Sequence, residues 1–184
     1  MVEEVIGGEL KGLLDKIQVS VNKLYHVATH DQKTGLYNNI FFRDVFILEL
    51  DKAKRGKKLS LIIVDIDFFK KVNDTYGHLT ADKILERVAR VLEKEVRKYD
   101  IVARFGGEEF FIMLPAASLK TAKRIAERLR KAVFHDNHLK KHKISVSLGI
   151  AEYKEMDNLD RISKRADKAL YKAKKEGRNR VCVA

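Results

Sequence analysis

The sequence is poor in residues that cross-link or interrupt a chain, because its 184 residues include one cysteine and one proline. Cys182 has no partner in the sequence, which excludes an internal disulfide and a cysteine-based metal site. Apolar runs stay well short of the ~20 residues that a membrane-spanning helix needs. The start of the chain, with Glu3 and Glu4 close behind Met1, lacks the pattern of a signal peptide. These absences predict a cytoplasmic protein without a membrane span in this chain.

The composition is that of a globular protein with a strong positive charge. Hydrophobic residues make up 45% and charged residues 35% of the sequence, which is typical of a folded domain. The formal net charge of +12 fits three interpretations: nucleic-acid binding, an anionic ligand or a well-solvated surface. The sequence contains no zinc finger, no aromatic RNA-binding strand and no long basic arm, so we expect no nucleic-acid partner.

Residues 1–28 predict a helix that is separate from the rest of the chain. Apolar residues recur every three or four positions from Ile6 to Val27, which gives an apolar seam between polar flanks. Two arrangements fit this pattern. The helix is either a connector that forms a coiled coil with a second copy, or it folds back onto the domain formed by residues 29–184.

The remaining pattern mixes helices and strands in an order that predicts an α+β fold. The continuous apolar run from Leu59 to Ile66 is typical of a strand buried on both faces. A hairpin from Ile101 to Leu114 requires antiparallel pairing, which argues against a doubly wound parallel sheet. We also expect helices near 41–53, 79–97, 122–133 and 162–173, a strand with one buried face at 144–150, a short strand at 181–183, and a loop at 71–78.

Two aspartates stand at the end of the first buried strand. Asp65 and Asp67 lie two residues apart, so their side chains point to the same face of the strand. A buried charge without a partner costs free energy, so both carboxylates need compensation. A divalent cation would supply it, and so would a role as N-cap of the following turn. We favour the cation for Asp65.

The hairpin carries acidic residues beside two glycines. Gly106 and Gly107 lie between its strands, where a tight turn requires the positive φ that glycine adopts without a steric penalty. Glu108 and Glu109 follow directly. Carboxylates hold hard cations and glycine lets a ligand approach the backbone closely, which suits a metal-bound polyphosphate. Taken alone, however, the pattern is at least as typical of a solvated turn with two surface glutamates.

Several motifs in order along the chain resemble the GGDEF family of diguanylate cyclases. The hairpin is similar to the family signature in its GGEEF form. The resemblance extends from about Asp31 to Val183, nearly everything outside the first helix. The matching segments are Asp31 to Asn38 for the opening motif DxLTGLxN, Asp65 to Asp74 for the first metal-binding strand, Gly77, His78 and Asp82 for GHxxGD, and Lys174 to Asn179 for KxxGRN.

The resemblance implies a central, mostly antiparallel sheet wrapped by helices, as in nucleotide cyclases and polymerase palm domains. It also implies the reaction, in which two GTP molecules on the two subunits of a homodimer condense to cyclic di-GMP and two pyrophosphates. Two magnesium or manganese ions per active site are implied as cofactors. Their implied ligands are Asp65, the backbone carbonyl of Ile66, Glu108 and Glu109, and Glu108 also assists deprotonation of the attacking hydroxyl.

The same resemblance assigns residues to the bound GTP. The guanine edge is assigned to Asn73 and Asp82, because a carboxylate accepts hydrogen bonds from N1–H and the exocyclic amine, a pattern that adenine lacks. The resemblance assigns binding of the phosphates to basic side chains and to exposed backbone. The implied phosphate-binding residues are Phe68, Phe69, Lys70, Gly107, Lys174 and Arg178.

A further match concerns control by the product. Arg97 to Asp100 (RKYD) matches the RxxD site of the family at its usual spacing before the hairpin. The resemblance implies that cyclic di-GMP binds there and inhibits the enzyme, with Arg128 as a second arginine. An RxxD pattern by itself is also typical of an exposed ion pair.

Three positions depart from the family pattern, and two other functions compete with the leading one. Lys33 replaces a leucine of the opening motif, Asn39 an arginine and Ala81 a glycine of GHxxGD; these changes bear on local packing more than on activity. One alternative is a catalytically silent GGDEF domain that binds GTP or cyclic di-GMP and regulates a partner, although the intact metal and GTP motifs argue against it. The other is an enzyme that makes a mixed GMP–AMP cyclic dinucleotide.

Overall fold

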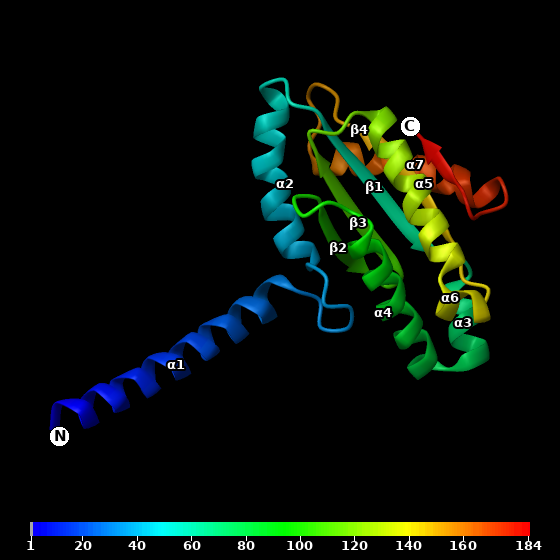
Figure 1. Cartoon of the computed structure of the whole chain (residues 1–184). Coiled ribbons are helices and arrows are strands. Elements are labelled where there is room, and N and C mark those ends of the chain that lie inside the picture. Colours follow the sequence, from blue (N-terminus) through cyan, green and yellow to red (C-terminus); the bar gives the residue numbers. More distant parts are fainter. Residues whose placement is uncertain (1) are drawn as a thin grey trace.

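The computed structural model describes the backbone of residues 2–184 and the side chains from residue 10 onward. Helices and strands are mixed along this part of the chain (Figure 1). The helices are α1 (Val2–Thr29), α2 (Asn39–Lys54), α3 (Phe69–Tyr76), α4 (His78–Lys94), α5 (Leu119–His135), α6 (Asn137–Lys141) and α7 (Leu159–Lys175). The strands are β1 (Leu59–Ile66), β2 (Ile101–Gly106), β3 (Glu109–Pro115), β4 (Val146–Glu152) and β5 (Val181–Val183).

The strands form one sheet in the order β2-β3-β1-β4-β5. Strand β1 lies at its centre, where it pairs antiparallel with β3 on one side and β4 on the other. All eight of its residues are buried, as the apolar run predicts. β2 and β3 form the antiparallel hairpin, and β5 runs parallel to β4. The predicted α+β fold with a mostly antiparallel sheet is confirmed.

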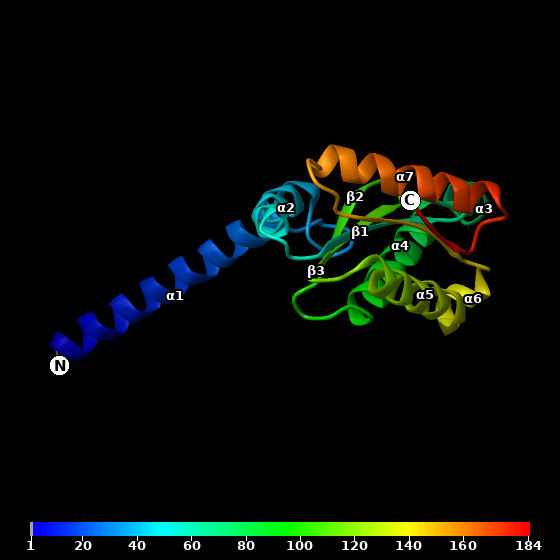
Figure 2. The ribbon, with the colours of Figure 1, turned by 90° about the horizontal axis from the view of Figure 1, so that it is seen from above.

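Helices cover both faces of the sheet. Figure 2 shows α2 and α7 on one face and α4, α5 and α6 on the other. Because side chains alternate along a strand, β1 supplies both cores. Leu61 and Ile63 belong to the core under α2 and α7, whereas Ile62 and Val64 belong to the core under α4 and α5. The end of β1 is therefore held between two packed layers.

Helix α7 lies very close to β4. A Cβ atom at Gly149 of β4 would come within 2.1 Å of the Ala166 carbonyl oxygen and 2.3 Å of the Leu170 nitrogen, both on α7. The predicted strand with a single buried face is therefore wrong, because residues 146–151 are all buried. Small residues such as Gly149 and Ala151, which the alternation placed on the outer face, allow α7 to cover that face.

Helix α1 projects away from the domain (Figures 1 and 2). Its described apolar side chains expose at least half of their surface, and they include Leu10, Leu13, Ile17, Val21, Leu24 and Val27. Ile6, the first residue of the predicted seam, lies outside the described side chains. None of the described helices combines the length and apolar character that crossing a membrane requires.

Stacked rings join the end of α1 to the domain. The ring of His26 stacks on His30 with 3.9 Å between centroids, and His30 contacts Tyr37 at 4.7 Å. Tyr37 in turn stacks on Phe41 of α2 at 4.3 Å. Burial and the neighbouring charge of His26 lower the pKa of His30. The junction is thus packed through aromatic and imidazole rings.

Three local features differ from the prediction: the segment 71–78, the end of α4, and the short helix α6. The expected loop at 71–78 is mostly the helix α3, whose eight residues bury only Phe69 and Val72, too few apolar positions to form a visible period. Helix α4 accordingly begins at His78 and ends at Lys94, three residues before the predicted end. The short α6 was not predicted, because its five residues bury only Leu139.

Candidate active site

The candidate site is built around Asp65, the single acidic residue of β1. Its Cα lies opposite Glu109 of β3 and Ser147 of β4, and the residue is 5% exposed. Lys174 of α7 reaches the carboxylate, with 2.8 Å between Lys174 Nζ and Asp65 Oδ2. The close packing of α7 on β4 therefore brings the KxxGRN motif against the end of β1.

The Lys174 ammonium group acts on two of the carboxylates, Asp65 and Glu109. Burial and the charges of Glu108 and Glu109 raise the pKa of Asp65 to about 6, although Lys174 opposes the shift. Burial also raises the pKa of Glu109, with Lys174 again opposing and Glu108 among the groups that raise it. The uncompensated negative charge is concentrated at the tip of the hairpin beside the end of β1.

The donor set fits a hard divalent cation that also binds substrate oxygens. Within the described residues, no group of three or more His, Cys, Asp or Glu side chains is arranged to enclose a metal. Mg²⁺ sites in proteins usually have one or two carboxylates per ion, with substrate phosphates as further ligands, so a site of this kind is incomplete without its substrate. Asp65, Glu108, Glu109 and the Ile66 carbonyl could hold such an ion once phosphate oxygens complete its shell.

Asp67 has a different environment although it points to the same side of the strand. Its carboxylate accepts hydrogen bonds from Ser145 Oγ at 2.6 Å, Ser147 Oγ at 2.7 Å and the backbone N–H of Asn179 at 3.1 Å. The residue is 4% exposed. Asp67 thus anchors the loop that follows α7 to the sheet.

The signature turn differs in detail from a glycine–glycine hairpin. Its two central residues are Gly107 and Glu108, and Gly107 has a φ of +50°. Gly106 ends β2 beside a register shift after Arg104. The predicted pair of turn glycines is therefore wrong by one residue, because Gly106 belongs to β2, at the β-bulge where the register shifts.

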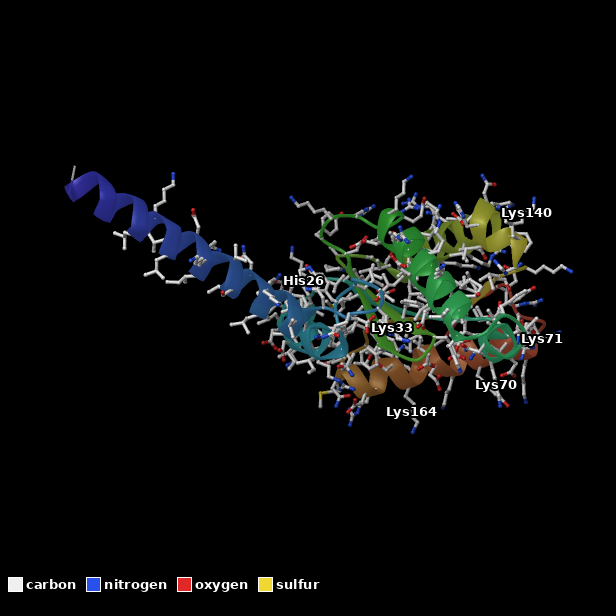
Figure 3. The ribbon with its side chains drawn as sticks, turned by 90° about the horizontal axis from the view of Figure 1, so that it is seen from below. His26, Lys33, Lys70, Lys71, Lys140 and Lys164 are labelled. Atoms are coloured by element: carbon white, nitrogen blue, oxygen red, sulfur yellow. The ribbon has the colours of Figure 1, made fainter. Side chains whose placement is uncertain are left out.

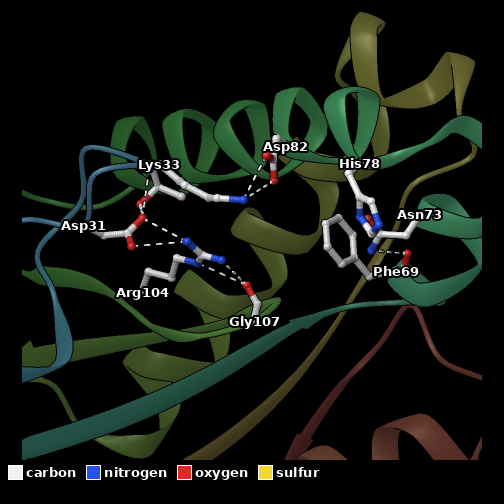
Figure 4. A network of polar contacts seen from close by, with 9 residues as sticks. Asp31, Lys33, Phe69, Asn73, His78, Asp82, Arg104 and Gly107 are labelled. Atoms are coloured by element: carbon white, nitrogen blue, oxygen red, sulfur yellow. Dashed lines mark hydrogen bonds and ion pairs between the residues drawn. The ribbon is translucent and has the colours of Figure 1, made fainter.

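Arg104 fixes this turn and connects it to the opening motif. Its guanidinium donates from Nε and Nη2 to the Gly107 carbonyl at 3.0 and 2.8 Å, and from Nη1 to the Asp31 carboxylate at 3.2 Å (Figure 4). Asp31 also accepts from the backbone and hydroxyl of Thr34. Burial raises the pKa of Asp31, but these hydrogen bonds and the Arg104 charge outweigh it and lower that pKa.

Two of the predicted phosphate-binding residues, Phe68 before α3 and Arg178 after α7, are in contact. Phe68 precedes α3 in the left-handed region with a φ of 57° and leaves the first N–H groups of the helix without a side-chain cap. The Arg178 guanidinium lies over the exposed Phe68 ring, 4.2 Å from its centroid. Figure 3 shows Lys70 on the side of the domain remote from α1. Free N–H groups and basic side chains at a helix start favour an anion.

The predicted guanine-binding residues already have partners (Figure 4). Asn73 Oδ1 lies 3.1 Å from His78 Nδ1, and Asn73 Nδ2 donates to the Phe69 carbonyl at 3.3 Å. Both oxygens of Asp82 accept from Lys33 Nζ, at 2.7 and 2.8 Å. Asn73 and Asp82 stand on α3 and α4, the two helices that Gly77 joins.

The RxxD residues form a separate group at the start of β2. The Asp100 carboxylate accepts from the backbone N–H of Arg97 at 2.9 Å, whereas the Arg97 guanidinium donates to the Tyr99 hydroxyl at 2.7 Å. Burial raises the pKa of Asp100, with Arg97 and Arg128 opposing. Arg128 itself bonds to Glu95. The alternative of an exposed ion pair is wrong for Asp100, because the carboxylate is buried.

The structure brings the predicted residues together in two groups and adds two residues that the sequence did not single out for the site. Asp65, Glu109 and Lys174 meet at the end of β1, whereas Arg97, Asp100 and Arg128 lie together elsewhere. A hollow of about 610 Å³ between α4 and α6 contains neither group. The sequence did not single out Arg104, which bonds to Asp31 and Gly107, or Lys33, which bonds to Asp82. Both lie within or next to a family motif.

Comparisons with known proteins agree with the sequence resemblance. A family model described as "Diguanylate cyclase, GGDEF domain" matches residues 28–180. Diguanylate cyclase A of Treponema denticola is 37% identical over an alignment of 179 residues, which covers 93% of this chain and 48% of that protein. Diguanylate cyclase DgcM of Escherichia coli is 40% identical over 163 residues, which are 88% of this chain and 40% of that protein. The chain thus spans less than half the length of these relatives.

A solved structure is similar to the chain over its whole length. The coiled coil and GGDEF domain of DgcB from Caulobacter crescentus, crystallised with c-di-GMP, superimposes with a TM-score of 0.87 at 29% identity. The match covers 100% of both chains, so it includes α1 as well as the domain.

Proposed function

Since the chain belongs to the GGDEF family of diguanylate cyclases, we propose that it condenses two GTP molecules to cyclic di-GMP and two pyrophosphates. The observation that carries this proposal is the group of acids at the end of β1. Asp65 is buried there, its pKa is raised to about 6, and Lys174 is its ion-pair partner. Ionisable groups with strongly shifted pKa values tend to gather at functional sites.

The chain's own residues would bind and orient the two reactants. The 3′-hydroxyl of one GTP attacks the α-phosphorus of the other, with pyrophosphate as the leaving group. Two Mg²⁺ or Mn²⁺ ions, held by Asp65, Ile66, Glu108 and Glu109, would supply the positive charge that such a transfer requires. Glu108, in the turn itself, would accept the hydroxyl proton.

Lys174 has two roles in this scheme. In the free protein its ammonium compensates Asp65 at 2.8 Å. It can turn to the triphosphate when a cation takes over that compensation. Arg178 and the free N–H groups at the start of α3 would bind the same phosphates, because Arg178 already lies over Phe68. Asn73 and Asp82 would bind the guanine edge.

We propose that activity requires two copies of the chain and that α1 brings them together. A single site holds one GTP, so two sites must face each other for the reaction. The exposed apolar residues from Leu10 to Val27 on α1 suit pairing with the same helix of a second copy. The structurally similar DgcB fragment is itself described as a coiled coil with a GGDEF domain.

Removal of α1 tests this assembly. A chain that begins at residue 29 should keep its fold, because α1 makes few contacts with the domain, but its specific activity should depend more steeply on protein concentration. Parallel measurement of activity and sedimentation over a dilution series would show the effect. An unchanged concentration dependence would assign dimerisation to another surface.

We also propose that cyclic di-GMP binds at Arg97, Asp100 and Arg128 and inhibits the enzyme. Both arginines lie near the buried Asp100 carboxylate, and an arginine fork matches a phosphate or the guanine Hoogsteen edge. Arg97→Ala should relieve inhibition by added product and leave the initial rate almost unchanged. Equal inhibition of the variant and the unmodified protein would remove this assignment.

The decisive experiment is incubation of the protein with GTP and Mg²⁺, followed by identification of the product by mass. We expect cyclic di-GMP from GTP and no product from ATP. Glu108→Gln serves as the inactive control. Binding of GTP without product formation would identify a silent regulatory domain, and a GMP–AMP product from mixed nucleotides would identify the mixed-dinucleotide enzyme.

A further inference from the structure

Lys33 lies directly against the carboxylate that is proposed to bind guanine. Its ammonium nitrogen is 2.7 Å from Asp82 Oδ1 and 2.8 Å from Oδ2. The two residues come from different segments, the loop before α2 and the start of α4, and Figure 4 shows the lysine reaching across between them. Their side chains remain 54% and 44% exposed, so a ligand can reach both.

The loop that carries Lys33 is held in a defined place. Asp31 accepts from the backbone and hydroxyl of Thr34, and Gly35 closes the turn with a φ of 74° and an N–H bond to the Asp31 carbonyl. Arg104 joins Asp31 to the Gly107 carbonyl of the signature turn. The position of Lys33 is thus coupled to the hairpin that forms the other side of the site.

We propose that Lys33 is a specificity-determining residue, which donates a hydrogen bond to O6 of guanine while it keeps one bond to Asp82. The inference rests on the proposed function, because it takes guanine as the base bound by Asp82. It assigns a role to a lysine at a position where the family motif has leucine, a side chain without a hydrogen-bond donor.

The chemistry of the base supports this role. The guanine edge presents one acceptor, O6, followed by two donors, N1–H and the exocyclic amine. Asp82 can accept from the two donors, which leaves O6 beside its carboxylate and beside the ammonium of Lys33. Adenine places an amino group where guanine has O6, and it places an acceptor at N1. Lys33 would therefore disfavour adenine at position 6, where donor would face donor, and Asp82 would disfavour it at N1, where acceptor would face acceptor. With leucine in place of Lys33, only the mismatch at N1 would remain.

Lys33 must release one of the two Asp82 oxygens to make this contact. The cost is small, because an exposed ion pair contributes little to stability and one of its two hydrogen bonds is kept. Lysine has three donors on a flexible stem. It can therefore bridge Asp82 and O6 with only a local change of rotamer.

The test compares two nucleotides that differ only at position 6. The probes are 3′-deoxy-GTP and its 6-thio analogue, which lack the attacking hydroxyl and so bind without turnover. Sulfur is a weaker acceptor than oxygen, while both donors to Asp82 are retained. Calorimetric titration with Mg²⁺ gives the affinity ratio of the two probes for the unmodified protein, Lys33→Met, Lys33→Arg and Lys57→Met. Lys57 is an exposed lysine in the loop between α2 and β1, so its variant controls for loss of one positive charge.

We expect the unmodified protein to prefer 3′-deoxy-GTP by about fivefold, the contribution of one hydrogen bond to a partly exposed charged group. Lys33→Met should reduce this preference to less than about twofold, whereas Lys33→Arg and Lys57→Met should retain it. An equal ratio in the unmodified protein and Lys33→Met overturns the inference. Tighter binding of both probes to Lys33→Met at an unchanged ratio also overturns it, because Lys33 would then only compete for Asp82.

The outcomes for the proposed function are read separately. Product formation from GTP by the unmodified protein tests the cyclase activity, and it does not depend on the affinity ratio. A protein that binds 3′-deoxy-GTP with a Lys33-dependent ratio but makes no product would disprove the activity and retain the inference. Thermal unfolding of each variant confirms that Lys33→Met is folded.

Discussion

Asp65 and Asp67 belong to the same strand end and point to the same side, yet their surroundings are opposite. Asp67 accepts three hydrogen bonds from two serines and a backbone N–H. Asp65 has one ammonium partner and two neighbouring glutamates, and its pKa is raised to about 6. A buried acid whose hydrogen bonds are satisfied stabilises the fold, whereas one surrounded by like charge is kept at a cost in stability. The comparison distinguishes a structural acid from a functional one by their neighbours rather than by their burial.

The largest expected effect is the loss of turnover on removing an acid of the Asp65 group. Asp65→Asn or Glu108→Gln should lower the rate by more than about a hundredfold, because each removes a proposed ligand of the catalytic metal. Circular dichroism should show a retained fold. The rate of cyclic di-GMP formation at saturating Mg²⁺ is the measurement, and a variant that keeps a tenth of the activity would contradict the assignment.

The second effect is a loss of stability at Asp67. Asp67→Asn removes the charge that two hydroxyls and one backbone N–H now share, and we expect the free energy of unfolding to fall by about 4 kcal/mol. Urea unfolding at pH 7 measures this loss. Asp74→Asn, an exposed aspartate on α3, is the matched control. A loss at Asp67 no larger than at Asp74 would show that the three hydrogen bonds do not anchor the loop.

The third effect is a pH dependence that Asp65 alone should produce. Its pKa is about 6 in the folded protein against 3.8 for an aspartate free of such surroundings, so the folded state binds the proton more tightly than the unfolded state. This contribution to stability is fully present below about pH 4 and is lost as the pH rises through about 6, on the order of 3 kcal/mol in total. Asparagine mimics the protonated acid and should not show this decline.

Unfolding in metal-free buffer between pH 4 and about 7 provides the measurement. The difference in stability between Asp65→Asn and the unmodified protein reports Asp65 together with its coupling to Glu109, whose charge acts on Asp65. The raised pKa of Asp100 and the lowered ones of Asp31, Asp136 and Glu152 affect both proteins alike. We expect Asp65→Asn to become the more stable protein as the pH rises. If the stabilities of the two proteins changed in parallel with pH, the unfavourable charge would belong to a group other than Asp65.

The smallest effect concerns a single donor to Asp67. Ser147→Ala removes the 2.7 Å bond to Asp67 Oδ1 and should cost about 1 kcal/mol with turnover retained. Ser145→Ala, which removes the other hydroxyl donor, should behave in the same way. If Ser147→Ala instead abolished activity, Asp67 would have to be counted with the functional acids, and the contrast with Asp65 would disappear.

The sequence predicted the parts of this molecule that depend on long or ordered patterns. The apolar run at β1, the hairpin and the helices with several buried positions were placed within a few residues. α3 and α6 were missed, because two buried residues or one do not make a period. The surroundings of Asp65 and Asp67 were also beyond prediction. Their partners, Lys174 for one and Ser145, Ser147 and Asn179 for the other, are about 80 to 110 residues away along the chain and meet only through the sheet and α7.

The missing side chain at Gly149 has a consequence at a distance. Its hydrogen atom sets the separation between β4 and α7, and α7 carries Lys174 at its far end. Any larger residue would collide with the α7 backbone and displace α7 from β4 by about the width of a methyl group. The ammonium would move with the helix away from Asp65, and the loop after it, which is proposed to bind phosphate, would move as well. In a survey of inactivating substitutions, Gly149 should therefore rank with the acids of the site, although it touches no ligand and takes part in no proton transfer.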